Sequence, residues 1–155
     1  MKYVFLFPGK TRESYIVAGI RDFTERLERF VQVEFVITRE GSAGKLPPNV
    51  LKKKEALMLL DKCGDASFLV ALDPGGREPD SEGLAHIQAN WEERGLRTIH
   101  FIIGGHYGLH EEILHRADLV LSLSRMTFTH EMSRLVLLEQ LYRGCMINGG
   151  RSYHY

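Results

Sequence analysis

The sequence predicts an α/β fold built on a parallel sheet, and three features of the chain support that prediction. Short apolar runs recur along the chain, and most of them stop at glycine, proline or small polar residues. Segments with the three- and four-residue spacing of an amphipathic helix lie between these runs. The runs are apolar without alternation, which indicates strands that are covered by helices on both faces.

The first half of the chain predicts two strands and two helices. Residues 3–7 form an apolar run that stops at a proline and a glycine, so a strand and a turn are expected there. A second strand is expected over residues 33–37. The intervening residues 11–30 show helical spacing of their apolar side chains, which are Ile16, Ile20, Phe23, Leu27 and Phe30. A loop rich in glycine and proline, residues 41–48, precedes a helix expected over residues 49–62.

The second half predicts three further strands that alternate with three helices. The expected strands cover residues 68–72, 98–103 and 119–123, and the expected helices cover residues 81–94, 110–116 and 131–146. Gly95 follows the first of these helices, at the position just past a helix end where glycine is favoured.

Composition places the chain among ordinary globular proteins. Its 155 residues are most simply one domain spanning 1–155, with 44% apolar and 26% charged residues. Twenty basic residues balance twenty acidic ones, which argues against broad non-specific binding to nucleic acid. Two cysteines provide no disulfide framework, and no apolar stretch reaches the roughly 18 residues that a membrane span needs. We therefore expect a cytoplasmic protein with no membrane association.

The loops that follow three of the predicted strands indicate a ligand pocket. In a parallel α/β sheet, ligands bind outside the carboxyl ends of the strands. The loops after Leu72, Ile103 and Leu121 lie at that edge, and the second contains Gly104, Gly105 and Gly108. Glycines there let the backbone approach an adenine or a ribose, although a simple tight turn also explains them. The glycine spacing does not match the dinucleotide-binding fingerprint.

Four histidines cluster in the same region, but we expect no metal site. His110 and His115 lie five positions apart, so on a helix they point about 140° away from each other rather than to one ligand. Surface or helix-capping roles fit these histidines better.

Basic side chains allow two interpretations that the pattern alone does not separate. Arg134 and Arg143 on the final helix either belong to its solvated face or face a phosphate or a polarised carbonyl. Likewise, Lys45 and the run 52–54 either form a solvated surface or contribute a patch that faces phosphates.

The C-terminal motifs resemble one family closely. The chain matches four parts of the family pattern, with departures. Residues 122–130 match Ser-Leu-Ser-x-Met-Thr-Phe-Pro-His, and Arg134 matches the arginine that follows. Residues 137–144 match Leu-x-Glu-Gln-Leu-Tyr-Arg-Ala, and residues 152–154 match Pro-Tyr-His. The glycine loop 103–109, the pair Leu72-Asp73 and the opening segment 9–11 also match. On these residues the chain resembles, over its whole length, the RlmH family of SPOUT-class methyltransferases, which act on a pseudouridine of large-subunit ribosomal RNA.

The resemblance implies a fold, a cofactor and partners. The fold would be a parallel-sheet SPOUT domain with a C-terminal trefoil knot, which nothing in the periodicity predicts. The cofactor would be S-adenosylmethionine, with N3 of a pseudouridine in 23S rRNA of the assembled ribosome as substrate and a homodimer as the working unit. By likeness, the cofactor contacts would be Leu72, Gly104, Leu123, Ser124, Arg125, Met126, Thr127 and Phe128.

Three residues are candidates for catalysis. Loss of the N3 proton leaves negative charge on the flanking carbonyl oxygens, which an arginine can stabilise, and an imidazole can accept the proton. We expect Arg143 to stabilise that charge, His154 to act as base or positioning group, and Tyr153 to orient or stack on the target. The apolar final helix is also expected to need a partner surface, which favours a dimer.

The chain departs from the family pattern at four positions. Thr129 and Ser152 replace prolines, which is expected to loosen the C-terminal segment. Tyr155 replaces a residue that is commonly basic. Gly144 replaces alanine and is expected to weaken the last helix by about 1 kcal/mol. Two alternatives therefore stay open: a non-catalytic protein that binds ribosomes or assists their assembly, and a SPOUT methyltransferase that acts on tRNA.

Overall fold

A computed structural model describes residues 1–42, 44–64 and 68–150 of the chain. Within them, five strands form one sheet, and all neighbouring strands are parallel in the order β2-β1-β4-β3-β5. The strands are β1 (Lys2–Pro8), β2 (Gln32–Thr38), β3 (Phe68–Arg77), β4 (Thr98–Ile103) and β5 (Leu119–Leu121). The helices are α1 (Ser14–Leu27), α2 (Pro48–Asp61), α3 (Ser81–Glu93), α4 (Glu111–Arg116) and α5 (His130–Asn148). The predicted parallel α/β fold and the order of its elements are confirmed.

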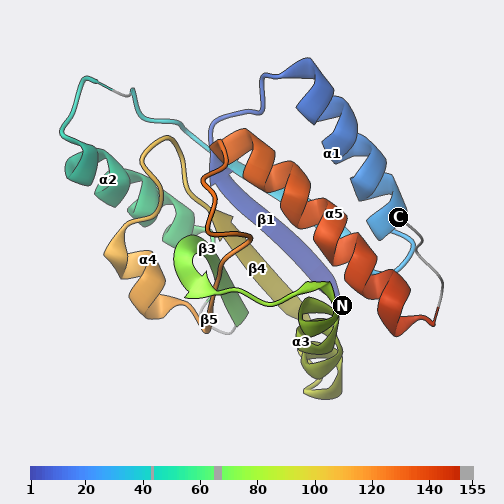
Figure 1. Ribbon diagram of the computed structural model, residues 1–155. Helices are drawn as coiled ribbons and strands as arrows, with labels where there is room; N and C mark the ends of the chain where they lie inside the picture. The colour runs from blue at the N-terminus through green and yellow to red at the C-terminus, as the bar shows by residue number, and fades with distance from the viewer. Residues whose placement is uncertain (43, 65–67, 151–155) are drawn as a thin grey trace.

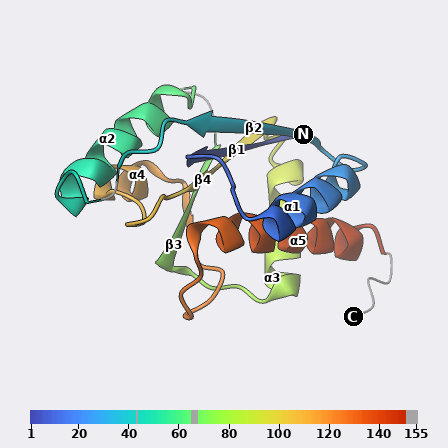
Figure 2. The same cartoon turned by 90° about the horizontal axis from the view of Figure 1, so that it is seen from above.

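Helices cover both faces of the sheet (Figures 1 and 2). On one face, α1, α3 and α5 enclose an aromatic core that includes Tyr3, Phe5, Trp91 and Phe101. On the other face, α2 and α4 pack on a smaller aliphatic core. Burial on both faces explains why the inner strands β1 and β4 lack polar alternation, whereas the edge strand β2 begins with alternating exposed and covered residues. None of the helices in the described ranges has the length and apolar character of a membrane span.

Helix α5 finds its packing surface within the chain. It lies along the sheet between α1 and α3 and buries Leu137, Leu138 and Leu141 in the aromatic core. The expectation that its apolar face needs a second copy of the chain is therefore wrong for these residues. A dimer would have to form through other parts of the molecule.

Strand β3 is longer than the sequence predicts. Its ladder with β5 is interrupted between Leu72 and Arg77, and both of these residues pair with Leu121. The backbone of Gly76 passes so close to that of Val120 that a Cβ there would lie 2.6 Å from the Val120 carbonyl carbon. Residues 73–76 thus leave the ladder at the carboxyl edge of the sheet, where the loops after β4 and β5 also lie.

Candidate functional site

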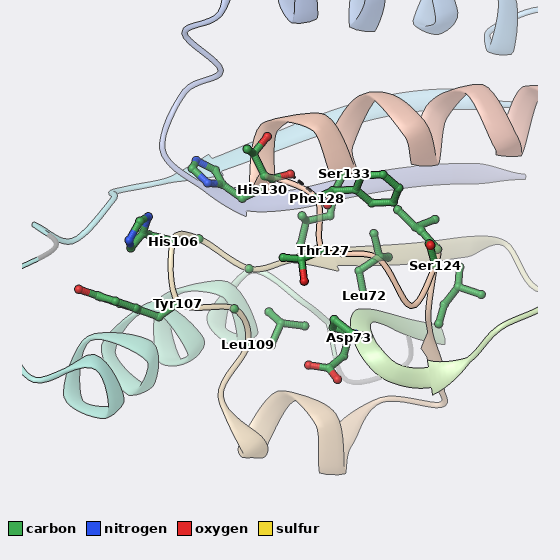
Figure 3. Close-up of a pocket in the computed structure, with 18 of the residues that line it drawn as sticks. Leu72, Asp73, His106, Tyr107, Leu109, Ser124, Thr127, Phe128, His130 and Ser133 are labelled. Carbon is green, nitrogen blue, oxygen red and sulfur yellow. Dashed lines mark hydrogen bonds between the residues drawn. The ribbon is translucent and has the colours of Figure 1, made fainter.

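A cavity of about 710 Å³ opens at the carboxyl ends of β3, β4 and β5 (Figure 3). This volume lies within the roughly 300–1,000 Å³ that is usual for small-molecule sites. The cavity is lined by 72–74, 103–109, 123–124 and 126–130, together with Lys52, Leu121 and Ser133. The three loops that the sequence placed at one edge therefore surround one pocket.

Seven of the eight predicted cofactor contacts line this cavity. They are Leu72, Gly104, Leu123, Ser124, Met126, Thr127 and Phe128. Arg125 is not among the lining residues: its side chain is 93% exposed, and its Nε lies 4.0 Å from a carboxylate oxygen of Glu78. The cofactor contacts remain predictions, and the geometry favours the seven over Arg125.

The glycine loop after β4 forms one wall of the cavity from backbone atoms. Gly104 packs directly on Gly108, because a Cβ on Gly104 would lie 2.5 Å from the Gly108 carbonyl carbon. Gly108 adopts a φ of +79°, which side chains rarely tolerate, and its N–H donates to the carbonyl of Gly105 at 3.1 Å. The loop is thus a tight turn, and this turn also lines the pocket.

The opposite wall, the segment between β5 and α5, is held by a chain of local hydrogen bonds. The Ser122 N–H donates to the Arg77 carbonyl at 2.8 Å, and the Met126 N–H donates to the Ser124 hydroxyl at 3.0 Å. At its end, the Thr129 hydroxyl accepts from the Met132 N–H at 3.2 Å and caps α5. Thr129 therefore adds a helix cap where the family pattern has proline, a compensation that the sequence did not predict.

Arg134 is a buried structural residue and does not face a phosphate. Only 1% exposed, it donates to the Pro8 carbonyl and to the Thr11 hydroxyl, both at 2.9 Å. Its guanidinium carbon lies 3.9 Å from the centroid of the Phe7 ring. Burial lowers the pKa of Arg134 to about 10, against the opposing influence of Glu131. The phosphate-facing interpretation is therefore wrong for Arg134.

Glu131 joins α5 to the start of α1. Its carboxylate accepts the backbone N–H groups of Arg12 and Glu13 at 3.0–3.1 Å. Burial by itself raises the pKa of Glu131, but the N–H groups of Glu13 and Arg12 and the charge of Arg134 outweigh it and hold the pKa below its usual value. Helix α1 starts at Ser14, later than the predicted residue 11, with the N–H groups of Arg12 and Glu13 bound to α5.

Arg143 lies on the same helix but away from the cavity. It forms an ion pair with Glu139, with an Nη2 to carboxylate distance of 2.5 Å and both side chains largely shielded from solvent. Ser133, the last lining residue, is ten positions earlier, about 15 Å along the helix axis. Arg143 therefore does not line the cavity of its own chain. Its predicted partners Tyr153 and His154 lie outside the described residues, so the catalytic assignments stay predictions.

The histidines take different roles in the structure. The His110 Nδ1 accepts from the Glu112 N–H at 3.3 Å and caps α4, and His115 is exposed. His106 and His130 line the cavity, and burial followed by the charge of Arg134 lowers the pKa of His130. Among residues 1–42, 44–64 and 68–150, no group of three or more histidine, cysteine or acidic side chains is arranged to hold a metal ion.

The predicted lysine patch divides into separate environments. Lys52 lines the cavity, whereas Lys53 is ion-paired with Glu112 at 3.4 Å. Lys45 and Lys54 are exposed.

Comparison with known proteins identifies the family. A family model described as "Predicted SPOUT methyltransferase" matches residues 1–154. The chain belongs to this family. The family membership confirms the resemblance seen in the C-terminal motifs and assigns the chain to the methyltransferases. The trefoil knot that is expected of the family stays a prediction for this chain.

Relatives of known name match the whole chain. The chain is 42% identical over 155 residues to ribosomal RNA large subunit methyltransferase H of Desulfotalea psychrophila, covering 99% of both proteins. It is 41% identical over 154 residues to the protein of the same name from Syntrophotalea carbinolica, again covering 99% of both.

Solved structures share the fold at much lower identity. A probable methylase family protein from Haemophilus influenzae aligns with a TM-score of 0.60 and 12% identity, covering 99% of this chain and 70% of that one. A probable methyltransferase from Bordetella pertussis aligns with a TM-score of 0.57 and 11% identity, covering 92% of this chain and 95% of that one.

Proposed function

We propose that this protein transfers a methyl group from S-adenosylmethionine to N3 of a pseudouridine in 23S rRNA of the assembled ribosome. The proposal rests mainly on one observation: the family's glycine loop and its 122–130 motif enclose a single cavity of cofactor size. Full-length relatives at about 40% identity are named as large-subunit rRNA methyltransferases, which supports the substrate class. Ribosomes as substrate imply a cytoplasmic enzyme.

The residues present fit the proposed cofactor. Apolar side chains from three strand ends, including Leu72, Ile103 and Leu123, provide surfaces for a flat base. The absence of side chains at Gly104 and Gly108 lets the loop turn tightly at the wall of the cavity, where its amide and carbonyl groups would lie close to a bound ligand. S-adenosylmethionine supplies a sulfonium methyl group that is already electrophilic. The protein therefore has to align the two reactants, exclude water and manage one proton.

We assign the proton chemistry to Arg143, Tyr153 and His154. Arg143 would stabilise the negative charge that develops on the carbonyl oxygens of the base, and His154 would accept or position the N3 proton, with Tyr153 orienting the ring. Because Arg143 lies about 15 Å from the cavity of its own chain, this role requires the Arg143 of a second copy.

A homodimer is therefore part of the proposal. Helix α1 exposes two apolar side chains, Tyr15 and Val17, on the two flanks of the buried Ile16, and they are 62% and 45% exposed. Met126, at the cavity mouth, is 72% exposed. Contact with a second chain would cover such surfaces and bring its Arg143 to the cavity. Light scattering at micromolar concentration measures the mass directly, and a monomer would exclude a catalytic role for Arg143.

Methyl transfer from labelled S-adenosylmethionine tests the activity. Ribosomes from a strain that lacks the modification are compared with free rRNA and with tRNA. Label on N3 of a pseudouridine in ribosomes supports the proposal, and a preference for tRNA supports the alternative substrate. Ribosome binding without any label, with cofactor binding intact, supports the non-catalytic alternative.

A variant of Arg143 tests the catalytic assignment. Arg143→Ala is expected to abolish methyl transfer and to leave cofactor affinity nearly unchanged. Arg94→Ala is the control, because it removes an exposed arginine at the end of α3, outside the surfaces proposed for the dimer. Turnover that survives in Arg143→Ala would remove this residue from the mechanism.

A further inference from the structure

The two ends of the cavity differ in chemistry. One end is formed by aliphatic side chains and Phe128, with Leu72 and Ser124 beside them (Figure 3). The other end carries His106 and Tyr107 on the glycine loop and His130 at the start of α5 (Figure 3). Lys52 of α2 is also part of the lining. One cavity thus combines an apolar compartment with an aromatic one.

Helix α2 lies directly against the loop that carries the aromatic residues. A Cβ on Gly105 would lie 3.0 Å from a carboxylate oxygen of Glu55 in α2. Glu55 is itself buried and accepts the Gly41 N–H at 3.2 Å, so this side of the mouth is anchored. Lys52 lies three positions before Glu55 and brings a positive charge to the lining.

His106 and Tyr107 form a paired aromatic surface at this end. Their ring centroids are 4.8 Å apart and the rings are nearly perpendicular, at 78°. In such an edge-to-face pair, His106 contacts at most one face of the Tyr107 ring. The pair therefore holds the Tyr107 ring in place and leaves a face of it available to another planar group. Tyr107 is partly exposed and His106 is exposed, which puts both in reach of a macromolecule.

We propose that Tyr107, supported edge-on by His106, stacks on an unpaired nucleobase of the RNA substrate while Lys52 contacts a neighbouring phosphate. Proteins recognise unpaired RNA bases by stacking them on aromatic rings and by placing cations along the backbone. The apolar compartment remains for the cofactor, so base and methyl donor enter from opposite ends. This inference rests on the proposed function and adds the RNA-contacting residues of the same site.

Binding measured without turnover tests the stacking role. Affinity for unmodified ribosomes is determined in the presence of S-adenosylhomocysteine, and affinity for S-adenosylmethionine is determined separately by calorimetry. Tyr107→Ala is expected to weaken ribosome binding about 10-fold, the usual size of a lost base stack. Tyr107→Phe keeps the ring and is expected to bind as the wild type does, and neither change alters cofactor affinity.

The lysine is tested by the salt dependence of binding. Lys52→Ala is expected to reduce the slope of log affinity against log salt concentration by about one, as loss of a single phosphate contact does. Lys62→Ala, at the far end of α2, is the matched control and is expected to keep the wild-type slope.

Three results would overturn the inference. These are unchanged ribosome affinity in Tyr107→Ala, an equal loss in Tyr107→Phe, and a loss of cofactor affinity that matches the loss of ribosome affinity. The last result would place Tyr107 in the cofactor site. These results can be distinguished from a failure of the proposed function. If the wild-type protein binds ribosomes but transfers no label, the comparison of ribosome affinity between the wild type and the Tyr107 variants is still valid.

Discussion

The two ends of α5 are held in different ways. Its first turns carry buried charges, Glu131 and Arg134, which bond to the end of β1 and to the segment that follows it. Its last turns are held by close packing against α3, where Gly144 leaves space for the buried side chain of Gln88. The end beside the cavity is thus held by buried charged side chains. The far end is held by close packing and by neutral hydrogen bonds, from Gln88 to the Leu141 carbonyl and from Asn148 to the Ala85 carbonyl.

This difference shows that residue type alone does not assign a role. Arg134 and Arg143 lie on one helix, yet the first is a buried scaffold residue and the second is ion-paired with Glu139 on the same helix. Polar anchoring next to the cavity sets the position of the wall that His130 and Ser133 provide. Substitutions at four positions test this contrast between the two ends: Arg134, Gly144, Gln88 and Thr129.

The largest effect is expected at the cavity end. Arg134→Ala leaves Glu131 buried without its neighbouring cation and removes the bonds to Pro8 and Thr11. We expect the free energy of unfolding to fall by about 3–5 kcal/mol, because two hydrogen bonds from a buried charged donor are lost, each worth roughly 1.5–3 kcal/mol. Urea unfolding followed by circular dichroism measures it. Arg94→Ala, which removes an exposed arginine, is the control, and a loss below about 1 kcal/mol for Arg134→Ala would contradict the polar anchor.

At the far end, a change that normally favours helices is expected to destabilise the protein. A Cβ on Gly144 would lie 1.7 Å from the Gln88 Oε1, so Gly144→Ala displaces a side chain that donates to the Leu141 carbonyl at 3.0 Å and to the Tyr3 hydroxyl at 3.2 Å. We expect a net loss of about 1–2 kcal/mol despite the gain in helix propensity.

A double variant separates the gain in helix propensity at position 144 from the cost of displacing the Gln88 side chain. In the background Gln88→Ala, the space beside Gly144 is open, so adding Gly144→Ala is expected to stabilise the protein by up to about 1 kcal/mol. Thermal unfolding of the four variants measures the coupling. If Gly144→Ala has the same effect in both backgrounds, the two residues are not adapted to each other.

A smaller effect is expected at the cap of α5. Thr129→Ala removes the bond to the Met132 N–H and is expected to cost about 1 kcal/mol. The backbone φ of Thr129 is −64°, which is the value that proline requires, so Thr129→Pro is expected to cost less than Thr129→Ala. Chemical denaturation compares the two variants. Because both lack the capping hydroxyl, a larger loss in Thr129→Pro would show that the backbone at this position does not accept proline.

The smallest effect is a dependence on pH far from the cavity. His100 in β4 is 8% exposed, burial lowers its pKa, and its Nδ1 has no hydrogen-bond partner within the described parts of the chain. The unfolded chain therefore binds a proton at His100 more readily than the folded chain does. The stability that neutral His100 contributes is present above about pH 6.5, and it is lost as the pH falls through the lowered pKa of His100 in the folded protein.

The variant His100→Gln isolates this contribution. Its free energy of unfolding is expected to fall less than that of the wild type between pH 7 and pH 5, as measured by urea unfolding at each pH. Parallel pH profiles for the two proteins would show that His100 does not titrate in this range in either state.

The sequence by itself determined the elements, the parallel sheet, the three loops that line the cavity and the family. These properties depend on local spacing and on contiguous motifs, both of which are visible in the sequence. For example, the run 98–103 predicts a buried strand, and the glycines after it predict the turn. The alternation of strands and helices then brings the three loop ends to one edge of the sheet.

Only the tertiary structure decided which charged residues serve the scaffold and which line the site. Glu131 bonds to the N–H of Arg12, 119 positions earlier in the chain, and Gly144 makes room for Gln88 on another helix. Arg125 lies inside the matching motif yet is exposed, while Lys52 lies outside it and lines the cavity. No local pattern encodes such pairings, because the direction of a side chain and its burial depend on how distant segments pack against each other.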